Sequence, residues 1–328
     1  MTTPLNILCQ SPISTGMTGA DAIRNTVDLA KRAEALGYHR FWVAEHHSDR
    51  ALAGAAPEVL ISHIASVTSR IRVGSGGVQI PFYAPLKVAE QFNTLGALFP
   101  GRIDLGMGRS GGSEGAAPQA LGMRNTGPKA FDAMDEVLGW LGREHNNPLP
   151  NTFASPAVES DVQPWILGTS PSSAEFAAKR GLPYAFGGFL DPRGMAPSLA
   201  AYHQHFRPNR SGNAPRTMLA WNVVVAPTDA EAQHLARSTE HWFVRTMLRG
   251  ENPPFEDPSE LAKASYAPME QMMLQMMRQM ALIGSPERVL EGLHTLTSGM
   301  HVDEMTVVTI PHAHDARVAS YELLMKAA

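Results

Sequence analysis

Short apolar runs alternate with longer amphipathic segments along most of this chain. The runs are rich in β-branched and aromatic residues and end at glycine or polar residues, which is typical of buried strands. We predict strands at Leu5–Cys9, Arg40–Ala44, from Ile71, at Arg102–Leu105, Trp165–Gly168, near Tyr184–Phe186, Leu219–Val225 and Glu304–Thr309. Apolar residues recur between them with the helical period, which predicts helices at Asp21–Leu36, after Pro57, at Pro85–Leu98, Pro128–Leu141, Pro171–Arg180 and Asp315–Met325.

Strands that alternate with helices in this way favour a parallel sheet, because each helix returns the chain to the start of the next strand. Eight such units predict an α/β fold that closes into a (β/α)8 or TIM barrel. The chain of 328 residues shows no internal repeat and no linker. We therefore expect a single domain over residues 1–328.

Two segments interrupt the alternation and predict insertions after strands four and seven. The first holds a glycine-rich loop and the Pro- and Asn-rich stretch Asn146–Pro164. The second, 249–282, contains Asn252-Pro-Pro254 and Asp257-Pro258, which cannot lie inside a helix. A long irregular excursion in a compact barrel is usually a lid or a binding loop, so we predict a lid over 249–282.

Two helix faces carry predictions about packing. In the second predicted helix, the pattern places Val59, Leu60, Ile64 and Val67 inward. The methionines of Met269–Met280 recur at i, i+3, i+4, i+7, i+8 and i+11, which is one face of a helix. Such a stripe indicates core or subunit packing, and the alternative is an adaptable wall for an apolar substrate, since thioethers are flexible and polarizable.

The composition narrows the class of protein. With 44% hydrophobic and 18% charged residues the chain is globular, and 27 Lys and Arg against 31 Asp and Glu give a net charge of −4. No basic excess exists to bind a nucleic acid or an anionic membrane surface. The lone Cys9 fits a reducing compartment, and Met1–Cys9 lacks the pattern of a signal peptide. No apolar run is long enough to cross a bilayer, so we expect a cytoplasmic protein.

Chemistry-bearing residues follow successive strands and should meet at one rim of the barrel. Glu45-His46-His47 ends the second strand, and adjacent side chains on a strand point to opposite sides, so the two histidines cannot readily share a metal. No other element has metal-ligand spacing, and we predict no metal site. In Gly74-Ser-Gly-Gly77, the residues Gly76 and Gly77 allow a flat ligand to approach closely, or else mark a simple bulge.

Arg109 follows the fourth strand inside Gly106-Met-Gly-Arg-Ser-Gly111, which matches the glycine pattern of nicotinamide-binding Rossmann folds. That fold requires a helix to begin within the motif. Here Gly112, Gly115 and Pro118 indicate a loop instead, and the motif lies well inside the chain. We therefore interpret Arg109 as a cation on the barrel rim that is available to a phosphate.

The segment Gly168-Thr-Ser-Pro-Ser-Ser173 joins the fifth strand to a helix. Ser170 fits the N-cap position with Pro171 at N1, which leaves the N–H groups of Ser172 and Ser173 free to point outward. A helix start of this kind binds anions, although capping alone explains one serine. The hydroxyls of Thr169, Ser170, Ser172 and Ser173 make phosphate binding the competing interpretation.

Several of these pieces together resemble the bacterial luciferase-like flavin monooxygenases, with the short single-type luciferase-like oxidoreductases as the nearest branch. The resemblance covers nearly the whole chain in the right order. Its pieces are Phe41–His47, Arg72–Val78, Pro85–Phe92, Phe99–Gly106, Trp165–Ser170, Ala177–Pro183 and Gly284–Glu287. One departure concerns the loop after Arg109, where relatives continue with Ala-Pro-Gly and this chain has Ser110–Glu114, which puts substrate contacts in that loop in doubt.

The resemblance implies a luciferase-like barrel that binds FMN at its C-terminal rim. By position, His46 corresponds to the histidine near the reactive edge of the flavin, and Gly76-Gly77 to a non-proline cis peptide beneath its ring system. Arg109, Ser170 and Ser173 would hold the phosphate, which agrees with the anion site inferred from the helix start. The segment 249–282 corresponds to a mobile lid. The resemblance also implies a homodimer, for which the second and third predicted helices are candidate contacts.

The activity implied is that of a two-component monooxygenase. A separate NAD(P)H-flavin reductase would supply FMNH2, and O2 would react through a C4a-peroxyflavin to oxygenate a small apolar organic substrate. Three alternatives stay open: F420-dependent hydride transfer on the same barrel, a non-catalytic flavin-binding protein, and, with less support, a nicotinamide-dependent dehydrogenase.

Overall fold

The computed structural model describes residues 3–109, 116–142, 149–157, 161–209 and 213–328. In these ranges the chain forms one parallel sheet of nine strands. The strands are β1 (Leu5–Cys9), β2 (Arg40–Val43), β3 (Arg72–Gln79), β4 (Ile103–Gly108), β5 (Gln163–Gly168), β6 (Tyr184–Gly187), β7 (Thr217–Val225), β8 (Ala281–Gly284) and β9 (Glu304–Val308).

The sheet closes on itself. Strands β1 to β6 pair in sequence order, β6 pairs with β7, β7 with β9, and β9 with β1. The predicted eight-stranded parallel barrel is therefore confirmed, because these eight pairings leave no edge. The eighth strand predicted from sequence is β9, and every predicted strand is present within a few residues of its expected bounds.

Strand β8 was not predicted. It pairs only with the C-terminal half of β7, from Asn222 opposite Ala281 to Val225 opposite Gly284. The predicted insertion over 249–282 thus includes the first two residues of this strand, Ala281 and Leu282. A four-residue strand with no alternating pattern carries too little periodicity to be recognised in sequence.

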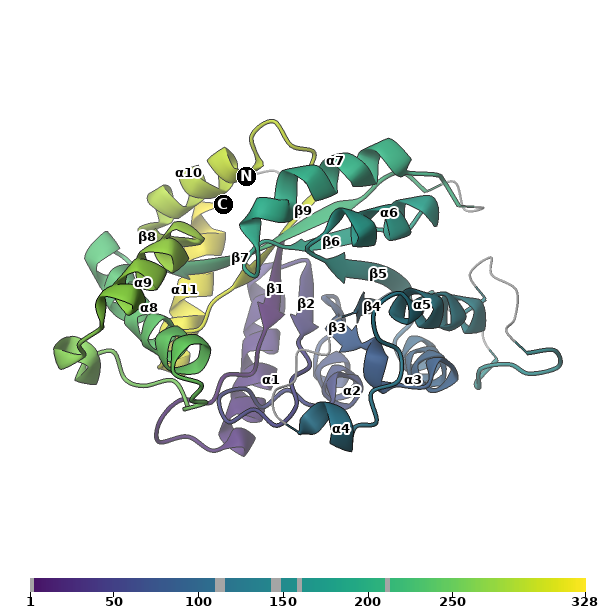
Figure 1. Ribbon diagram of the computed structural model, residues 1–328, viewed down its shortest axis with the longest axis horizontal. Coiled ribbons are helices and arrows are strands. Elements are labelled where there is room, and N and C mark those ends of the chain that lie inside the picture. Colours follow the sequence, from purple (N-terminus) through teal and green to yellow (C-terminus); the bar gives the residue numbers. More distant parts are fainter. Residues whose placement is uncertain (1–2, 110–115, 143–148, 158–160, 210–212) are drawn as a thin grey trace.

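The helices surround the barrel on its outer face (Figure 1). They are α1 (Gly19–Leu36), α2 (Pro57–Val67), α3 (Pro85–Leu98), α4 (Ala117–Ala120), α5 (Lys129–Trp140), α6 (Pro171–Lys179), α7 (Met195–His205), α8 (Asp229–Phe243), α9 (Pro268–Gln279), α10 (Pro286–Thr297) and α11 (His314–Ala327). Among the described residues, no helix combines the length and apolarity that crossing a bilayer would require.

Helix α2 buries two of the four residues predicted to point inward, Leu60 and Ile64. Its buried apolar residues are Leu60, Ile61, Ile64 and Ala65, whereas Val59 is 66% exposed and Val67 is 41% exposed. Both valines are apolar, but Val59 lies on nearly the opposite side of the helix from the centre of the inward stripe, and Val67 lies about a quarter of a turn from it. The prediction that Val59 and Val67 point inward was therefore wrong. A helix that is apolar on more than one side leaves the choice of buried face to the tertiary packing.

The N-terminal end of the barrel is filled by a buried network of charges. The Arg40 guanidinium donates to Asp104 (2.5 Å from Nη1 to Oδ2) and to Glu304 (2.8 Å from Nε to Oε2), and its side chain is 1% exposed. Arg72 donates to the other oxygen of Asp104 at 2.6 Å, and Arg216 pairs with Glu304. Although burial by itself raises the pKa of Glu304, the arginine charges outweigh it and hold that pKa below its ordinary value.

This network predicts a large loss of stability when one carboxylate is removed. Asp104→Asn keeps the shape but leaves Arg40 and Arg72 short of a counter-ion inside the barrel, which should cost about 3–5 kcal/mol of unfolding free energy. Chemical denaturation monitored by circular dichroism measures the change. Glu175→Gln, in an exposed pair with Lys179, is the matched control and should cost about 0.5 kcal/mol or less. Equal losses in the two variants would contradict the assigned role of the network.

Candidate active site at the carboxyl ends of the strands

The structure brings the predicted site residues to one rim. His46, the Gly76-Gly77 pair, Arg109 and the segment 169–173 follow or end β2, β3, β4 and β5, which are neighbours in that order. Parallel neighbours end at the same edge of a sheet. Segments far apart in the chain therefore surround one opening, as the strand-end pattern predicted.

His46 lies beside the end of β1. Its Nε2 is 2.6 Å from Oε1 of Gln10, and its backbone N–H donates to the carbonyl of Gly54 at 2.7 Å. Burial lowers the pKa of His46 below its ordinary value of 6.5. A neutral imidazole facing an amide oxygen carries its proton on Nε2, which leaves Nδ1 as an acceptor. Gln10 was not predicted as a site residue, although it directly follows the first strand.

The neighbours of His46 form a second polar cluster that the sequence did not reveal. The Glu45 carboxylate accepts from Nε2 of His47 (2.7 Å), the hydroxyl of Tyr83 (2.9 Å) and the backbone N–H of Gln79 (3.0 Å). Burial raises the pKa of Glu45, while these donors act in the opposite direction. As predicted, His46 and His47 diverge, and the Glu45 bonds join the end of β2 to the end of β3.

The Gly76-Gly77 peptide is cis, which confirms the expectation drawn from the resemblance. The pairing of β3 with β4 also shifts register between Ser75 and Val78, so the bulge interpretation holds as well. Neither glycine has room for a side chain: a Cβ on Gly76 would lie 2.6 Å from Cδ1 of Leu8, and one on Gly77 would lie 2.7 Å from the carbonyl oxygen of Gly106. Bare backbone therefore forms this part of the rim.

Arg109 is held at the rim by uncharged groups. Its Nη2 donates to Oγ of Ser170 (3.2 Å) and of Ser172 (3.4 Å), and its guanidinium lies 4.3 Å above the ring of Phe131. No carboxylate of the described residues pairs with Arg109. The site therefore presents a positive charge that is oriented but not neutralised, which is what an incoming anion requires.

The start of α6 adds to this positive surface. Ser170 occupies the N-cap position, but its hydroxyl makes no capping hydrogen bond and instead accepts from Arg109. The capping interpretation is therefore wrong for the Ser170 side chain. Its hydroxyl lies 3.0 Å from that of Ser172, so two hydroxyls and one guanidinium converge at the positive end of a helix dipole.

Ser173 differs from its prediction. Its side chain is fully buried, its N–H donates to the carbonyl of Ser170 (3.1 Å), and its hydroxyl donates to the same oxygen (2.7 Å) and lies 3.2 Å from the hydroxyl of Tyr184. The expected outward N–H of Ser173 was therefore wrong, because the first turn of α6 folds back on the N-cap carbonyl. Ser173 supports the loop from behind. Thr169 is half-buried beside Gly187 and Gly194.

The loop departure at Ser110–Glu114 lies outside the described residues. Within the described part of the chain, no group of three His, Cys, Asp or Glu side chains could hold a metal ion.

The insertion after β7 lies across the rim and is anchored at Phe255. That side chain is fully buried and stacks on Trp242 at 5.1 Å, and its backbone bonds to Ile13 and Thr15 in the loop after β1. Helix α9 follows. It buries a single residue, Leu274, and two bidentate ion pairs hold its ends: Arg249 with Glu270, and Arg278 with Glu240.

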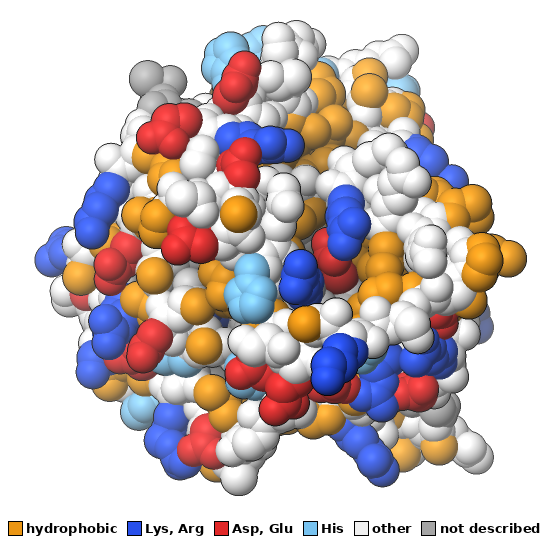
Figure 2. Space-filling model, turned by 90° about the vertical axis from the view of Figure 1, so that its left-hand side faces the viewer, with side chains coloured by type: hydrophobic (Ala, Val, Ile, Leu, Met, Phe, Trp, Pro, Cys, Tyr) orange, Lys and Arg blue, Asp and Glu red, His pale blue; other side chains and the backbone are white. Residues whose placement is uncertain are grey.

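The methionines of α9 are not core residues of this chain. Met269, Met272 and Met276 are 66%, 53% and 51% exposed, so the core interpretation was wrong for these three positions. Figure 2 shows the side of the molecule that carries α8 and α9, where hydrophobic side chains are scattered among acidic and basic ones. Subunit packing and the substrate-wall interpretation both stay predictions.

Comparison with known proteins agrees with this geometry. The family model described as luciferase-like monooxygenase matches residues 3–302. The chain belongs to the luciferase-like monooxygenase family. It is 41% identical to the uncharacterized protein YwcH of Bacillus subtilis, over 98% of both chains, and 35% identical to the N-acetyl-S-alkylcysteine monooxygenase of the same organism, over 98% of this chain and 97% of that one.

Solved structures share the fold of this luciferase-like family member. The crystal structure of apo-MsnO8 superposes with a TM-score of 0.90 at 36% identity, covering 99% of this chain and 97% of that one. The FMN complex of the oxygenating constituent of 3,6-diketocamphane monooxygenase from Pseudomonas putida matches with a TM-score of 0.71 at 20% identity, covering 99% and 97%. An F420-dependent secondary alcohol dehydrogenase matches at 0.65 and 14%, covering 100% and 99%. The last two likenesses concern the fold alone.

The environment of His46 predicts a pH dependence of stability. Because burial lowers its folded pKa, the unfolded chain binds the proton more tightly, so the contribution of His46 is complete above about pH 6.5 and declines as pH falls below that value. Unfolding midpoints measured from pH 5 to 8 should fall toward acid in the parent protein. His46→Gln keeps a hydrogen-bonding side chain without this titration, so the slope should be shallower, and parallel curves for the two proteins would contradict the assignment.

Proposed function

We propose that this protein is the oxygenase of a two-component FMN-dependent monooxygenase that acts on a small apolar organic molecule with O2. A separate NAD(P)H-flavin reductase would supply FMNH2. The observation that carries the proposal is Arg109, a cation without a carboxylate partner among the described residues, beside two serine hydroxyls and a helix N-terminus. This group lies on the same rim as bare glycine backbone and a neutral histidine.

The residues present fit FMN. A phosphate carries the negative charge that Arg109, Ser170 and Ser172 are arranged to receive, with Thr169 and the buried Ser173 supporting the loop. A planar ring system needs a surface without protruding side chains. The Gly76-Gly77 peptide provides one beneath the rim. The rim thus presents backbone without side chains at the Gly76-Gly77 peptide and a positive charge near β5.

Bound reduced flavin would supply the electrons that activate O2 for insertion of one oxygen atom into the substrate. In this proposal the residues of the chain bind and orient the flavin and shield it from water. Gln10 holds Nε2 of His46, so that Nδ1 offers a hydrogen-bond acceptor at a defined position. The insertion anchored at Phe255 covers the rim and excludes water, which would otherwise cause side reactions.

Two other functions use the same fold. An F420-dependent hydride transferase would also present a cation to a phosphorylated cofactor, and a non-catalytic flavin-binding protein would hold flavin without turnover. Anaerobic mixing with reduced FMN, followed by oxygen, separates the proposals. Slower flavin oxidation than in free solution supports the monooxygenase, tighter binding of reduced F420 than of FMNH2 supports hydride transfer, and activity that is unchanged in His46→Ala supports simple flavin binding.

Loss of the Arg109 charge should weaken FMN selectively. Arg109→Ala removes a charge-assisted contact worth about 1.5–3 kcal/mol, so the dissociation constant for reduced FMN should rise by about 10- to 100-fold. Riboflavin lacks the phosphate and should bind both proteins equally. Lys179→Ala, at the other end of the same helix, is the control and should leave FMN affinity unchanged. An equal loss for FMN and riboflavin would place the phosphate elsewhere.

We also propose that the protein forms a homodimer through α2 and α3. The exposed apolar residues Val59 and Val67 on α2 and Leu98 on α3 support this, since a helix already packed on the barrel has no internal use for them. Val59→Glu should therefore shift the mass measured by size-exclusion chromatography with light scattering from dimer to monomer. Met272→Glu on α9 is the contrasting variant, and a monomer produced only by that change would move the interface to α9.

A further inference from the structure

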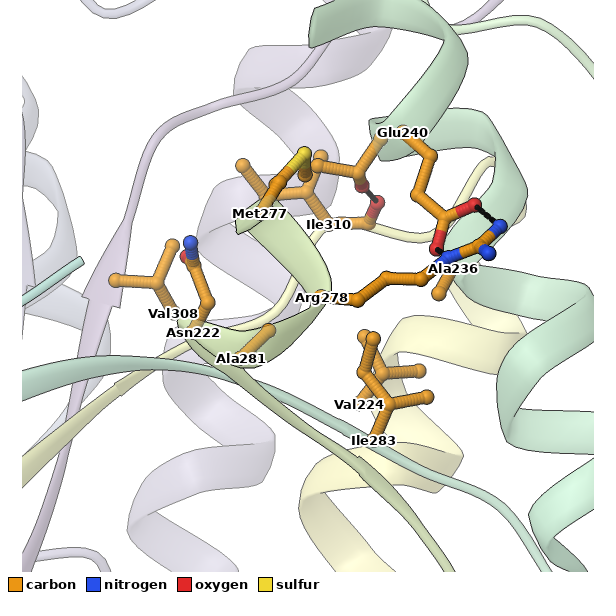
Figure 3. Close-up of a pocket in the computed structure, with 11 residues that line it drawn as sticks. Asn222, Val224, Ala236, Glu240, Met277, Arg278, Ala281, Ile283, Val308 and Ile310 are labelled. Carbon is orange, nitrogen blue, oxygen red and sulfur yellow. Dashed lines mark hydrogen bonds and ion pairs between the residues drawn. The ribbon is translucent and has the colours of Figure 1, made fainter. Parts of the chain in front are cut away.

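A small cavity of about 30 Å³ lies under helix α9. It is partly open and is bordered by β7, β8, β9 with the segment that follows it, α8 and α9 (Figure 3). Its lining is mostly aliphatic and consists of Asn222, Val224, Ala236, Thr239, Glu240, Met277, Arg278, Ala281, Ile283, Val308 and Ile310.

The cavity borders the mouth of the barrel. Val308, which lines it, also belongs to the cluster that fills the barrel interior with Leu8, Trp42 and Trp165, and Ile310 packs against that same cluster. Asn222 is paired directly with Val308 in the sheet. A molecule in this cavity would therefore lie beside the same opening that carries His46 and Arg109, on the side formed by β7 and β9.

Among the polar side chains that line the cavity, Asn222 is the one without a partner among the described residues. Its side-chain amide makes no hydrogen bond with any described residue, and Figure 3 shows it beside Val308. The other polar side chains are satisfied. The hydroxyl of Thr239 donates to the carbonyl of Ile310 at 2.5 Å, and Glu240 and Arg278 neutralise each other through two hydrogen bonds of 2.6 Å.

We propose that this cavity receives the organic substrate and that Asn222 anchors it. The substrate is uncharged and mainly aliphatic, and it carries one carbonyl-type oxygen that accepts from the Asn222 amide. A charged group would be costly here, because the Glu240–Arg278 pair leaves no net charge to compensate its desolvation. The role as substrate site rests on the function proposed above, whereas the binding of such a molecule does not.

The wall formed by α9 must withdraw for the substrate to fit, because a cavity of about 30 Å³ accommodates no more than a few water molecules. The structure provides for this movement. Helix α9 buries only Leu274, and its ends are held by ion pairs of the exposed Arg249 and Arg278 with less exposed carboxylates rather than by apolar packing. Met277 itself is unbranched and can change rotamer at small cost.

The test measures binding to the flavin-free protein by isothermal titration calorimetry. The probes are linear methyl ketones from 2-butanone to 2-octanone, with dipropyl sulfide as an apolar ligand lacking the carbonyl and hexanoate as a charged one. Wild type should bind the ketones and exclude hexanoate. Asn222→Leu keeps the branched shape and the number of heavy atoms, and it should weaken 2-heptanone by about tenfold while leaving dipropyl sulfide unchanged.

Two methionine variants locate the site. Met277→Ala enlarges the wall and should shift the preference toward longer ketones, whereas Met276→Ala, on the exposed face of the same helix, should change nothing. Failure of wild type to bind any ketone, equal ketone affinity in wild type and Asn222→Leu, or tighter binding of hexanoate than of 2-heptanone would each overturn the proposal. Reduced-FMN affinity is measured on the same samples. Ketone binding in a protein that binds no flavin would overturn the proposed function and leave the cavity assignment standing.

Discussion

The bidentate grip of Arg40 on Asp104 and Glu304 is the interaction on which the rest of this barrel depends. Arg40 stands at the start of β2, Asp104 on β4 and Glu304 at the start of β9, so one guanidinium ties three strands together across the interior. A buried ion pair of this kind adds little net stability compared with an apolar core. It tolerates no mismatch, however, because any other register would leave charges unpaired in a dry interior. The network therefore specifies how the strands align.

That alignment separates the barrel into three levels with different tasks. Charges close the N-terminal end, and Trp42, Trp165 and Met218 fill the middle. The two levels are linked by Trp42, whose indole N–H donates to Asp104 at 3.0 Å. The structural contacts at the C-terminal end are local ones, such as the Glu45 bonds that join β2 to β3. Its strands can end in glycine, an uncharged histidine and an unneutralised arginine, which are groups that stabilise the fold little and bind ligands well.

The insertion after β7 is held less uniformly than the barrel. Phe255 anchors it firmly over the loop after β1, but α9 beyond it buries one side chain and relies on two ion pairs whose arginines are exposed. Salt weakens an ion pair that solvent can reach. The molecule thus joins a firmly held rim to an adjustable wall over an apolar space. Such a division suits the proposed function, in which a flat, charged cofactor and an apolar substrate bind side by side.

The sequence by itself determined the order and type of most elements, because each barrel strand is a short buried run and each helix shows its period over several turns. It also predicted that His46, Gly76, Gly77 and Arg109 share a rim, since parallel strands end at one edge. The cis peptide at Gly76-Gly77 was expected from the resemblance alone, and the structure contains it.

Only the tertiary structure decided the features that depend on which segments meet. Helix α2 is apolar around much of its surface, so the packing against the barrel decides that Leu60 and Ile61 are buried and Val59 is exposed. Ser170 and Ser173 are the same residue type in the same helix start. The Ser170 hydroxyl accepts a hydrogen bond from Arg109 at the rim, whereas the Ser173 hydroxyl is buried and contacts Tyr184 and the N-cap carbonyl. Strand β8, the Glu45 cluster and the unpaired amide of Asn222 likewise arise from contacts between distant residues. The local sequence pattern gives the structural propensity of each segment. Whether a polar group there is hydrogen-bonded depends on partners elsewhere in the chain.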